Sequence, residues 1–353
     1  MKIALLNDTH FGARNDSEAF RNYQIDFFEN QFFPYIKEHN IKTLIHLGDV
    51  VDRRKFINHQ TASVFRKKFF DKLWQEKIDT HIIIGNHDTY YKNTNEVNAV
   101  ENLYTSFDGQ NEPWIYTGPK VVNFDGTDIL FVPWICEDNY QQSIDAIKTA
   151  KADLCFGHLE IKGIEMQNGV INEHGLEKKD FARFDRVISG HFHKHTDDGQ
   201  IYYLGAQYEM TWSDYKDPKG FHIFDTETRE IERIINPRTI HKKLIYNDKE
   251  KNYDNFDLQS FNNHFIKLIA LNKTNDEMFD KLVERMYNEI AVHDLNIIED
   301  YSDIKASVKE DILEMGEDTI TFLNNYVDQL DTEINKAKLK EYLKSIYIEA
   351  SEA

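Results

Sequence analysis

The stretch Thr80-His81-Ile82-Ile83-Ile84-Gly85-Asn86-His87-Asp88 governs the interpretation of the whole chain. Its first five residues form an apolar run, typical of a buried strand, and Gly85 ends that run. An amide, an imidazole and a carboxylate then follow in consecutive positions. Because alternate side chains of an extended backbone point in opposite directions, one can face a metal ion while its neighbour faces a substrate. A hairpin turn without chemistry can have the same sequence, so this segment alone does not define a function.

Four other apolar segments are also followed, directly or after one glycine, by Asp or His residues. The carboxyl ends of strands in an open α/β sheet line one crevice, so these polar side chains are expected to converge. Four of the five endings begin with glycine, which lets backbones and ligands lie close together. In chain order the endings are Asp8-Thr9-His10, Gly48-Asp49, Gly85-Asn86-His87-Asp88, Gly157-His158 and Gly190-His191-Phe192-His193.

The order of the expected elements indicates an α/β protein. Early strands alternate with amphipathic helices, as in βαβ units, and later strands are short, with a hairpin around Asp125-Gly126. Pro34 is expected to kink or end the first helix. The predicted fold is a two-sheet mixed β-sandwich flanked by helices. Its expected strands include residues 2–7, 42–47, 80–84, 153–156 and 184–188, and its expected helices include 17–38, 58–75, 98–104 and 143–150.

Two smaller units are expected after this sandwich. A polar connection rich in Asn and Asp at residues 247–254 suggests a boundary, so the first domain is predicted to span residues 1–250. Residues 251–305 have the pattern strand, helix, strand, which predicts a small α/β domain. Residues 306–353 carry apolar side chains at helical spacing and predict a C-terminal helical segment.

The net charge of −19 argues against a nucleic-acid partner, because DNA-binding proteins normally carry a basic surface. The charge is unevenly distributed, however. Residues 276–353 hold 8 Lys and Arg against 20 Asp and Glu, whereas the preceding 275 residues hold 34 against 41. Carboxylates that bind metal ions contribute to the second difference. The acidity therefore weakens a DNA-binding interpretation without excluding it.

Length and composition favour a cytoplasmic protein. No run of about 18 apolar residues predicts a membrane span, and the apolar run after Met1 is too short for a secretory signal. Cys136 and Cys155 both lie in apolar runs, so two buried thiols are expected rather than a disulfide.

The polar endings contain seven hard or borderline metal ligands, which suit a pair of Mn(II), Fe(II) or Zn(II) ions. Two such ions can orient a phosphate, activate a nucleophile and stabilise the leaving oxygen. Asp49 is the expected bridging ligand, since one carboxylate can bind both ions. The remaining ligands are expected as two sets, Asp8, His10 and His193 for one ion and Asn86, His158 and His191 for the other.

His87 belongs to neither set and is expected beside the substrate. An imidazole at that place can protonate the departing oxygen, a general-acid step worth roughly 10²–10⁴-fold in rate. Asp88 either orients His87 or supports the turn.

With these motifs in this order, residues 8–193 resemble the calcineurin-like metallophosphoesterase superfamily. Within it, the segment from Leu47 to Asp52 and the C-terminal additions resemble the nuclease subunits of double-strand-break repair complexes. That branch includes the bacterial SbcD subunit and the small subunits of T-even-type phage recombination endonucleases. Three segments strengthen the match to the phage type: Pro133-Trp134-Ile135-Cys136-Glu137, Ser189-Gly190-His191-Phe192-His193 and Asp217-Pro218-Lys219-Gly220-Phe221.

The resemblance implies a Mn-dependent DNA nuclease, with Mg(II) as a further alternative, that is an exonuclease on duplex ends and an endonuclease on single strands or hairpins. It implies that His87 is the catalytic histidine and that residues 251–305 present DNA to the site. It also implies that the tail binds an SbcC-type coiled-coil ATPase in a bacterial or phage-infected cell. Helices at 58–75 and 96–107 would pair two subunits into a homodimer, although from the residues alone they predict intramolecular core.

One position departs from part of that family. Archaeal and eukaryotic relatives have a second histidine three residues after the bridging aspartate, where this chain has Asp52, as bacterial and phage relatives do. A proton relay between two histidines therefore does not transfer to this chain. Asp52 is expected to position His87 or to close a turn.

The expected DNA contacts lie in the loops around the site. Arg53, Arg54 and Lys55 form a compact basic cluster suited to phosphates, with a solvated surface run as the alternative. Tyr90 can stack on a splayed base, with a packing role as its alternative. Tyr208 and Trp212 are expected to shape the pocket.

Two other functions compete with the nuclease. A phosphoprotein phosphatase or a small-molecule phosphodiesterase would use the same metal core, and the capping unit and tail favour the nuclease over both. A DNA-tethering scaffold with a vestigial site belongs to a different class, and it is disfavoured because every expected metal ligand is present.

Overall fold

The computed structural model describes residues 1–104, 112–167 and 170–299, and residues 327, 336, 338–340 and 342–343. The described residues form two compact units, one made of residues 1–210 and 216–240 apart from the gaps, and one that contains residues 211–215 and 241–299. The division falls at residue 240 rather than 250, because the strand that begins at His241 pairs with a strand of the second unit. Apart from seven positions, the helical segment expected at 306–353 lies outside the described residues.

The first unit contains two mixed sheets, as predicted, and each sheet has six strands. Their facing side chains form one core, with Leu5, Ile45 and Ile83 from one sheet against Phe131 and Phe156 from the other. In spatial order the first sheet is β14 (Ile231–Ile235), β13 (Gly220–Asp225), β1 (Lys2–Leu6), β2 (Thr43–His46), β3 (Asp79–Ile83) and β4 (Trp114–Tyr116). The second is β11 (Thr196–Asp197), β12 (Ile201–Tyr203), β10 (Arg186–Ser189), β7 (Leu154–Gly157), β6 (Thr127–Val132) and β5 (Lys120–Phe124).

The strand directions bring the functional loops to one edge. Strands β1, β2 and β3 are mutually parallel, and so are β7 and β10 in the other sheet. Only the outer strands β13 and β14 of the first sheet run antiparallel to their neighbours. Consequently the carboxyl ends of β1, β2 and β3 lie at the same edge of their sheet.

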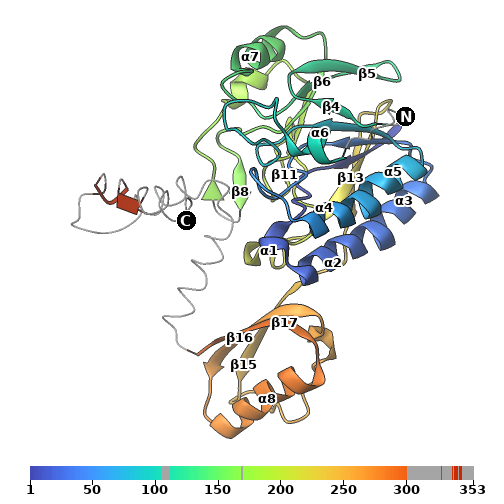
Figure 1. Ribbon diagram of the computed structural model, residues 1–353. Coiled ribbons are helices and arrows are strands. Elements are labelled where there is room, and N and C mark those ends of the chain that lie inside the picture. The colour runs from blue at the N-terminus through green and yellow to red at the C-terminus, as the bar shows by residue number, and fades with distance from the viewer. Residues whose placement is uncertain are drawn as a thin grey trace. The chain divides into compact units, whose positions relative to one another are not determined.

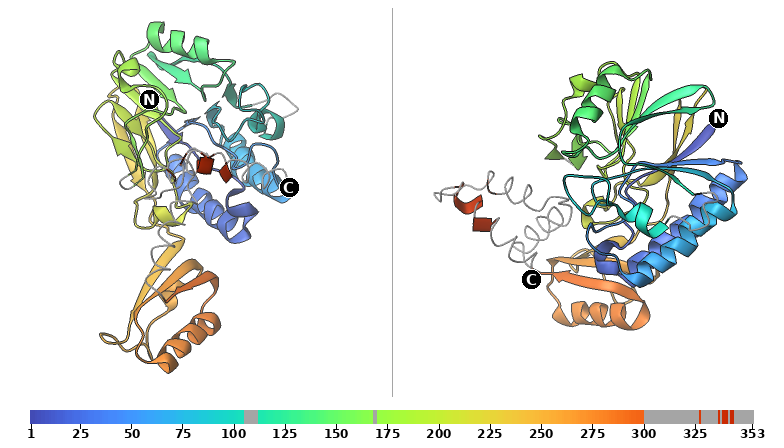
Figure 2. Two further views of the ribbon diagram at one scale, coloured as in Figure 1. Left: turned by 90° about the vertical axis from the view of Figure 1, so that its left-hand side faces the viewer. Right: turned by 45° about the horizontal axis from the view of Figure 1, so that its top comes forward.

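Two long helices lie side by side over the first sheet (Figures 1 and 2). The first joins α2 (Glu18–Phe27), the π-helical η1 (Phe28–Phe32) and α3 (Phe33–Glu38), and the second joins α4 (His59–Phe65), η2 (Arg66–Phe70) and α5 (Asp71–Gln75). The kink or end expected at Pro34 takes the form of η1, where the N–H of Phe33 bonds the carbonyl of Phe28. This wider turn precedes a residue that lacks an N–H, so the helix continues to Glu38.

Phenylalanines fill the space beneath these helices. The ring of Phe11 stacks on Phe65 with centroids 3.8 Å apart, and Phe28 and Phe69 approach to 4.8 Å. Phe70 stacks on Tyr104 of α6 (Ala99–Tyr104) at 4.2 Å. The buried faces of the helices expected at 58–75 and 98–104 therefore pack within this chain.

The remaining elements of the first unit complete the second sheet. Helix α7 (Tyr140–Thr149) buries Ile147 against the side of that sheet where Leu130 and Val187 lie. The β5–β6 hairpin turns at Asp125 and Gly126, both with positive φ, as a two-residue hairpin requires. The short elements are α1 (Ala13–Asp16), β8 (Glu165–Gln167), β9 (Val170–Ile171), η3 (Lys178–Phe181) and, in the second unit, η4 (Trp212–Asp214) and η5 (Gln259–Phe261).

The second unit is a small α/β fold, as expected for the region after the sandwich. Strands β15 (His241–Asn247), β16 (His264–Asn272) and β17 (Val292–Ile298) form a parallel sheet in that order. Helix α8 (Asp276–Glu289) connects β16 to β17 and covers one face of the sheet (Figure 2). Its buried residues Phe279, Leu282 and Met286 pack into the core of this unit.

Within the described residues, no helix has the length and apolar character needed to cross a membrane.

Candidate metal centre

Strand ends from both sheets bring the predicted ligands together. Strands β1, β2 and β3 of the first sheet are followed by Asp8, Asp49 and Asn86, and β7 and β10 of the second by His158 and His191. Three of the loops turn sharply, with positive φ at Asp8, His10, Asp49 and His191. Such angles are uncommon outside glycine and cluster at functional sites, because the surrounding structure must hold them.

One group consists of Asp8, His10 and His193, whose ligand atoms all lie within 4.8 Å of one another. His10 Nε2 lies 3.2 Å from His193 Nε2 and 3.9 Å from Asp8 Oδ1. Asp8 and His10 are buried, and His193 is partly exposed. Two imidazoles and a carboxylate at this separation are a donor set suited to a borderline divalent cation.

A second group consists of Asp49, His158 and His191, again within 4.8 Å. Asn86 belongs with them, because its Oδ1 lies 2.8 Å from His158 Nε2 and 3.2 Å from His191 Nδ1. All four side chains are buried. The structure thus brings the members of each predicted set close together. His10, Asp49 and His87 form a third group within the same 4.8 Å, so His87 also lies at ligand distance.

Asp49 lies between the groups. Its Oδ2 is 3.3 Å from His158 Nε2 and 3.8 Å from His10 Nε2. Although this oxygen is buried, it accepts no hydrogen bond from any residue that the structure describes. Burial alone would raise the pKa of the Asp49 carboxyl, but the imidazoles of His158 and His87 hold it well below its usual range. A buried anionic oxygen between two sets of ligands fits a carboxylate that bridges two cations.

A backbone carbonyl orients one of the histidine ligands. His158 Nδ1 lies 2.8 Å from the Leu47 carbonyl, which can only accept, so the proton is placed on Nδ1. In the neutral ring, which is the form that binds a metal, Nε2 offers its lone pair on the side of Asp49 and Asn86. This arrangement of a fixed tautomer with the second nitrogen available is what metal-binding histidines require.

His87 stands at the edge of both groups. Its backbone N–H donates to Asp49 Oδ1 at 2.7 Å, and its Nδ1 contacts the backbone carbonyl of Asp52. The ring lies edge-on to His10 with centroids 4.8 Å apart and is partly exposed to solvent. The imidazole is therefore next to the ligands in a partly exposed residue, and its Nε2 atom is itself buried.

Asp88 holds the turn that carries Asp49. Its carboxylate accepts four backbone N–H groups, from Gly85 and Asp49 at 2.9 Å, Val50 at 2.7 Å and Val51 at 3.1 Å. Burial and the neighbouring Asp49 raise the pKa of Asp88 to about 7, against the opposing effect of these donors. Of the two roles expected for Asp88, these contacts describe the support of the turn, and they tie the second and third strand ends together.

Two glycines allow the loops that follow β2 and β3 to pass in direct contact. A Cβ on Gly85 would lie 2.2 Å from Asp49 Oδ1, and one on Gly48 would lie 2.5 Å from His158 Nδ1 and 2.8 Å from the Gly85 Cα. Gly48 also has φ +91°, a conformation that L side chains rarely adopt. The two glycines that the sequence places before ligands therefore let two backbones pass in direct contact.

The residues expected to bind substrate occupy two adjoining loops. Arg53 pairs with Asp16, Arg54 donates to Thr89 Oγ1 at 2.9 Å, and Lys55 is exposed. Tyr90 is 42% exposed, directly after Thr89. Asp52 contacts His87 through its backbone carbonyl, while its carboxylate Oδ1 lies 3.7 Å from His10 Nδ1.

Two further residues support the first ligand loop. Sequence reasoning missed Gln24, and it expected Tyr208 to shape the pocket. Gln24 Nε2 and Tyr208 Oη donate to the carbonyl of Thr9 at 2.8 and 2.6 Å, between the ligands Asp8 and His10. The signal for Gln24 is that an amide stands on the otherwise aromatic face of the first helix. Tyr208 thus contacts a ligand loop, whereas Trp212, expected to shape the pocket with it, packs on His241 in the second unit.

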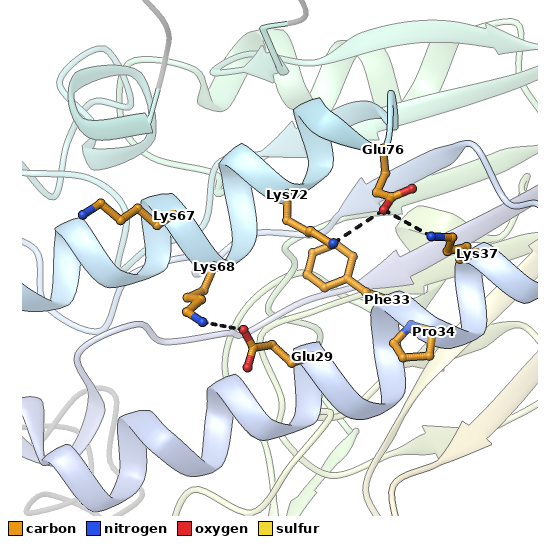
Figure 3. Close-up of a pocket in the computed structure, with 8 residues that line it drawn as sticks. All are labelled: Glu29, Phe33, Pro34, Lys37, Lys67, Lys68, Lys72 and Glu76. Atoms are coloured by element: carbon orange, nitrogen blue, oxygen red, sulfur yellow. Dashed lines mark hydrogen bonds and ion pairs between the residues drawn. The ribbon is translucent and has the colours of Figure 1, made fainter.

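The groove between the two long helices contains none of the expected site residues (Figure 3). Lysines line it, and two glutamates partly neutralise them: Lys68 lies 2.6 Å from Glu29, and Lys72 and Lys37 lie 3.5 and 3.8 Å from Glu76. Exposed ion pairs of this kind contribute little to stability. The candidate metal ligands lie instead at the strand ends.

Comparisons with known proteins identify the family of this chain. The calcineurin-like phosphoesterase family model matches residues 1–195. The chain belongs to the calcineurin-like phosphoesterase family, whose members use a dinuclear metal site, and it is a metal-dependent phosphoesterase.

Among individual proteins, the chain is similar to exonuclease subunit 1 of Enterobacteria phage T4, with 34% identity over 358 aligned positions that cover both chains completely. Two solved structures are more distant. An archaeal phosphodiesterase is 16% identical over 67% of this chain and all of its own, with a TM-score of 0.33. A protein of unknown function from Aquifex aeolicus is 18% identical over 44% of this chain and 77% of its own, with a TM-score of 0.25.

Proposed function

We propose that this protein is the nuclease subunit of a DNA recombination and repair complex, and that it hydrolyses DNA phosphodiester bonds with two Mn(II) ions. The observation that carries the proposal is the buried Asp49 oxygen between two sets of ligands, with His87 hydrogen-bonded to the same carboxylate. Full-length similarity to a phage exonuclease subunit supports DNA as the substrate. The activities proposed are an exonuclease on duplex ends and an endonuclease on single strands or hairpins.

The predicted ligands would bind two cations. Asp49 would bind both, and each of the two groups of histidine, carboxylate and amide ligands would bind one. A bound pair of divalent cations would neutralise the phosphate charge and activate water for attack. The mixture of imidazole, carboxylate and amide oxygen suits Mn(II), with Mg(II), Fe(II) and Zn(II) as the alternatives to compare.

His87 is the proposed general acid. Its Nδ1 faces the Asp52 carbonyl and therefore carries a proton, so the ring acts as an acid in its doubly protonated form. In that form Nε2 holds the second proton, which it gives to the departing oxygen. The bond from its backbone to Asp49 fixes where that nitrogen stands relative to the ligands. Asp52 thus acts on His87 through its carbonyl, and Asp88 acts by holding the Asp49 turn.

The proposed assembly is a homodimer that binds an SbcC-type coiled-coil ATPase through residues 306–353. The name of the phage relative, a subunit, supports a partner. The acidity of the C-terminal region suits a basic groove on that partner. The second unit, with its three parallel strands and α8, is the proposed element that presents DNA.

The decisive experiment incubates the purified chain with a 5′-labelled linear duplex, a labelled hairpin and a phosphotyrosine peptide, with Mn(II) or Mg(II). Mn-dependent shortening of the duplex that disappears in Asp49→Ala is the expected result. Dephosphorylation of the peptide with intact DNA, also in the presence of the ATPase, would replace the nuclease by a phosphatase on the same core.

The partner proposal has its own test. A chain truncated after residue 305 is expected to keep basal nuclease activity and to lose co-purification with the ATPase. Retained binding would place the ATPase contact elsewhere on the molecule.

A further inference from the structure

We propose that Phe56, Tyr90 and Tyr91 form a base-stacking surface at the mouth of the metal centre, here named the aromatic edge. It takes an unpaired base next to the phosphate that is cut, so the enzyme acts on a nucleotide that has left the duplex stack. This inference rests on the proposed nuclease function, and it names the form of DNA and the residues that select it.

Exposure is the first observation. Phe56 is 63% exposed, Tyr91 52% and Tyr90 42%, whereas the aromatic rings under the neighbouring helices are almost completely buried. Each Å² of apolar surface that stays exposed forgoes roughly 25 cal/mol of stabilising free energy from burial. Several exposed rings in neighbouring loops therefore indicate a surface that is covered when a ligand binds. The cluster lies in the two loops that also carry Asp52 and His87.

Position is the second observation. The loops of residues 52–56 and 87–91 are joined at two points, where His87 Nδ1 contacts the Asp52 carbonyl and Arg54 donates to Thr89 Oγ1 at 2.9 Å. Tyr90 and Tyr91 follow His87 by three and four residues. A base on these rings would therefore belong to a nucleotide at or next to the scissile phosphate.

The tyrosine loop is held in place before any substrate binds. The N–H of Tyr90 donates to the carbonyl of Val97 at 2.9 Å, and Thr89 forms a bridge with Asn98. The rings of Tyr90 and Tyr91 meet edge to face, with centroids 4.7 Å apart. Such preorganisation lowers the entropic cost of binding a flexible single strand.

Charge favours a nucleic acid over an apolar protein segment as the occupant. Lys55 and Lys92 flank the rings in the sequence and are exposed, whereas Arg53 is paired with Asp16. The Arg53 guanidinium lies over the Phe56 ring at 4.6 Å. Cations interleaved with aromatic faces are the combination that binds single strands, because phosphates meet the cations while every base has a face to stack.

The experiment is a double-mutant cycle between protein and DNA. Single-stranded oligonucleotides carry one abasic nucleotide at successive positions around a defined cut, and they are cleaved by the wild-type chain, Tyr90→Leu and Tyr91→Leu. Tyr140→Leu is the matched control, since Tyr140 is 52% exposed on α7 and outside the edge. Sedimentation of each variant is measured in parallel.

An abasic nucleotide next to the cut is expected to slow the wild type about tenfold, the size of one lost stacking interaction. Tyr90→Leu or Tyr91→Leu is expected to slow cleavage of the intact strand by a similar factor and cleavage of the abasic strand no further. Additive losses, or tyrosine variants as fast as Tyr140→Leu, would overturn the aromatic edge while leaving the nuclease intact.

Two other outcomes are distinguishable. A change from dimer to monomer in the tyrosine variants, with the abasic effect unchanged, would overturn the proposal and make the edge an interface between copies of the chain. A wild-type chain that hydrolyses bis(4-nitrophenyl) phosphate but cuts no DNA would refute the proposed function itself, and the aromatic edge with it.

Discussion

The backbone N–H of His87 donates to Asp49 Oδ1 at 2.7 Å, while the other oxygen of Asp49 faces His158 and His10. One carboxylate therefore fixes both the position proposed for the two cations and the backbone of the proposed general acid. The Asp49 backbone is in turn held by Asp88, through N–H groups on either side of the crossing with Gly85. Binding and proton transfer thus share one scaffold, but their contributions can be separated by substitution.

The first prediction concerns His87. His87→Ser removes the imidazole and keeps the backbone bond to Asp49, so cleavage should fall by roughly 10²–10⁴-fold while both cations still bind. The measurement combines initial rates of DNA cleavage with calorimetric titration of Mn(II). A variant that cleaves at the wild-type rate would remove His87 from the chemistry, and one that loses a cation would make it a ligand.

The second prediction is that substitution of Asp88 lowers the stability of the fold rather than acting on the chemical step alone. In Asp88→Asn an amino group must face two backbone N–H donors whichever way the amide turns, because each carboxylate oxygen accepts two of the four. Each buried donor left without an acceptor costs about 1–3 kcal/mol, so the free energy of unfolding should fall by about 3 kcal/mol. Denaturant unfolding measures it, with the exposed Asp128→Asn as the control. A stable variant that has lost only activity would give Asp88 a catalytic role.

The glycine crossing provides a steric test. Gly85→Ala places a methyl group 2.2 Å from Asp49 Oδ1, so the ligand loop must shift and Mn(II) binding should weaken at least tenfold. Gly118→Ala is the matched control, because its nearest neighbour would be Gln142 Oε1 at 3.4 Å and its φ is not in the left-handed region. Equal Mn(II) affinities in the two variants would show that the loops can separate without loss of the centre.

Tyr208 is predicted to position the first ligand loop. Tyr208→Phe keeps the buried ring and removes the hydroxyl that donates to the Thr9 carbonyl at 2.6 Å. Removing a group that orients metal ligands by hydrogen bonds typically lowers metal affinity by about 10–100-fold. The Mn(II) affinity of Tyr208→Phe should therefore fall by about tenfold. Titration calorimetry checks this, with Tyr246→Phe in the second unit as the control. Loss of stability with unchanged Mn(II) affinity would reduce Tyr208 to a packing residue.

The final prediction concerns acid stability without bound metal. Burial lowers the pKa of His46 to about 3 in the folded chain, whereas an unfolded histidine titrates near 6.5. Between these values the unfolded state binds one more proton, so the stability associated with neutral His46 is fully present above pH 6.5 and is lost as the pH falls toward 3. The slope is about 1.4 kcal/mol per pH unit.

His46→Gln should remove that contribution, so the difference in unfolding free energy between the wild type and the variant should change with pH across this window. Denaturant unfolding in a chelator at pH 7, 6, 5 and 4 measures the difference. A constant difference would mean that His46 is protonated in the folded chain or does not titrate in the unfolded one.

Much of the fold could be predicted from local sequence. Apolar runs closed by glycine predict β2, β3, β7 and β10, and helical spacing predicts the two long helices, because these signals depend only on neighbouring residues. The same logic predicts the convergence of the ligands, since the ends of parallel strands share one edge. The assignment of ligands to two groups followed from the chemistry of bridging. The geometry brings the members of each group together and also places His87 near His10 and Asp49.

What local sequence did not predict depends on tertiary contacts. The strand at residues 241–247 belongs to the second unit because it pairs with β16, and no local pattern specifies a partner. Gln24 and Tyr208 reach Thr9 across 15 and 199 residues, so their role requires the folded chain. At Pro34 the π-helical turn carries the helix on, an outcome that helix propensity alone does not indicate.

The two sheets contribute ligands from opposite ends of the first unit's sequence, and this sets the order of events during synthesis. Asp8, Asp49 and Asn86 leave the ribosome early, but His191 and His193 emerge only after more than half of the 353 residues. The sheet that carries the early ligands also waits for β13, whose residue Asp225 pairs with Lys2. A nascent chain therefore lacks part of the predicted ligand set until His193 has emerged. Selection among competing metals at the complete pair of sites can therefore begin only after more than half of the chain has been synthesised.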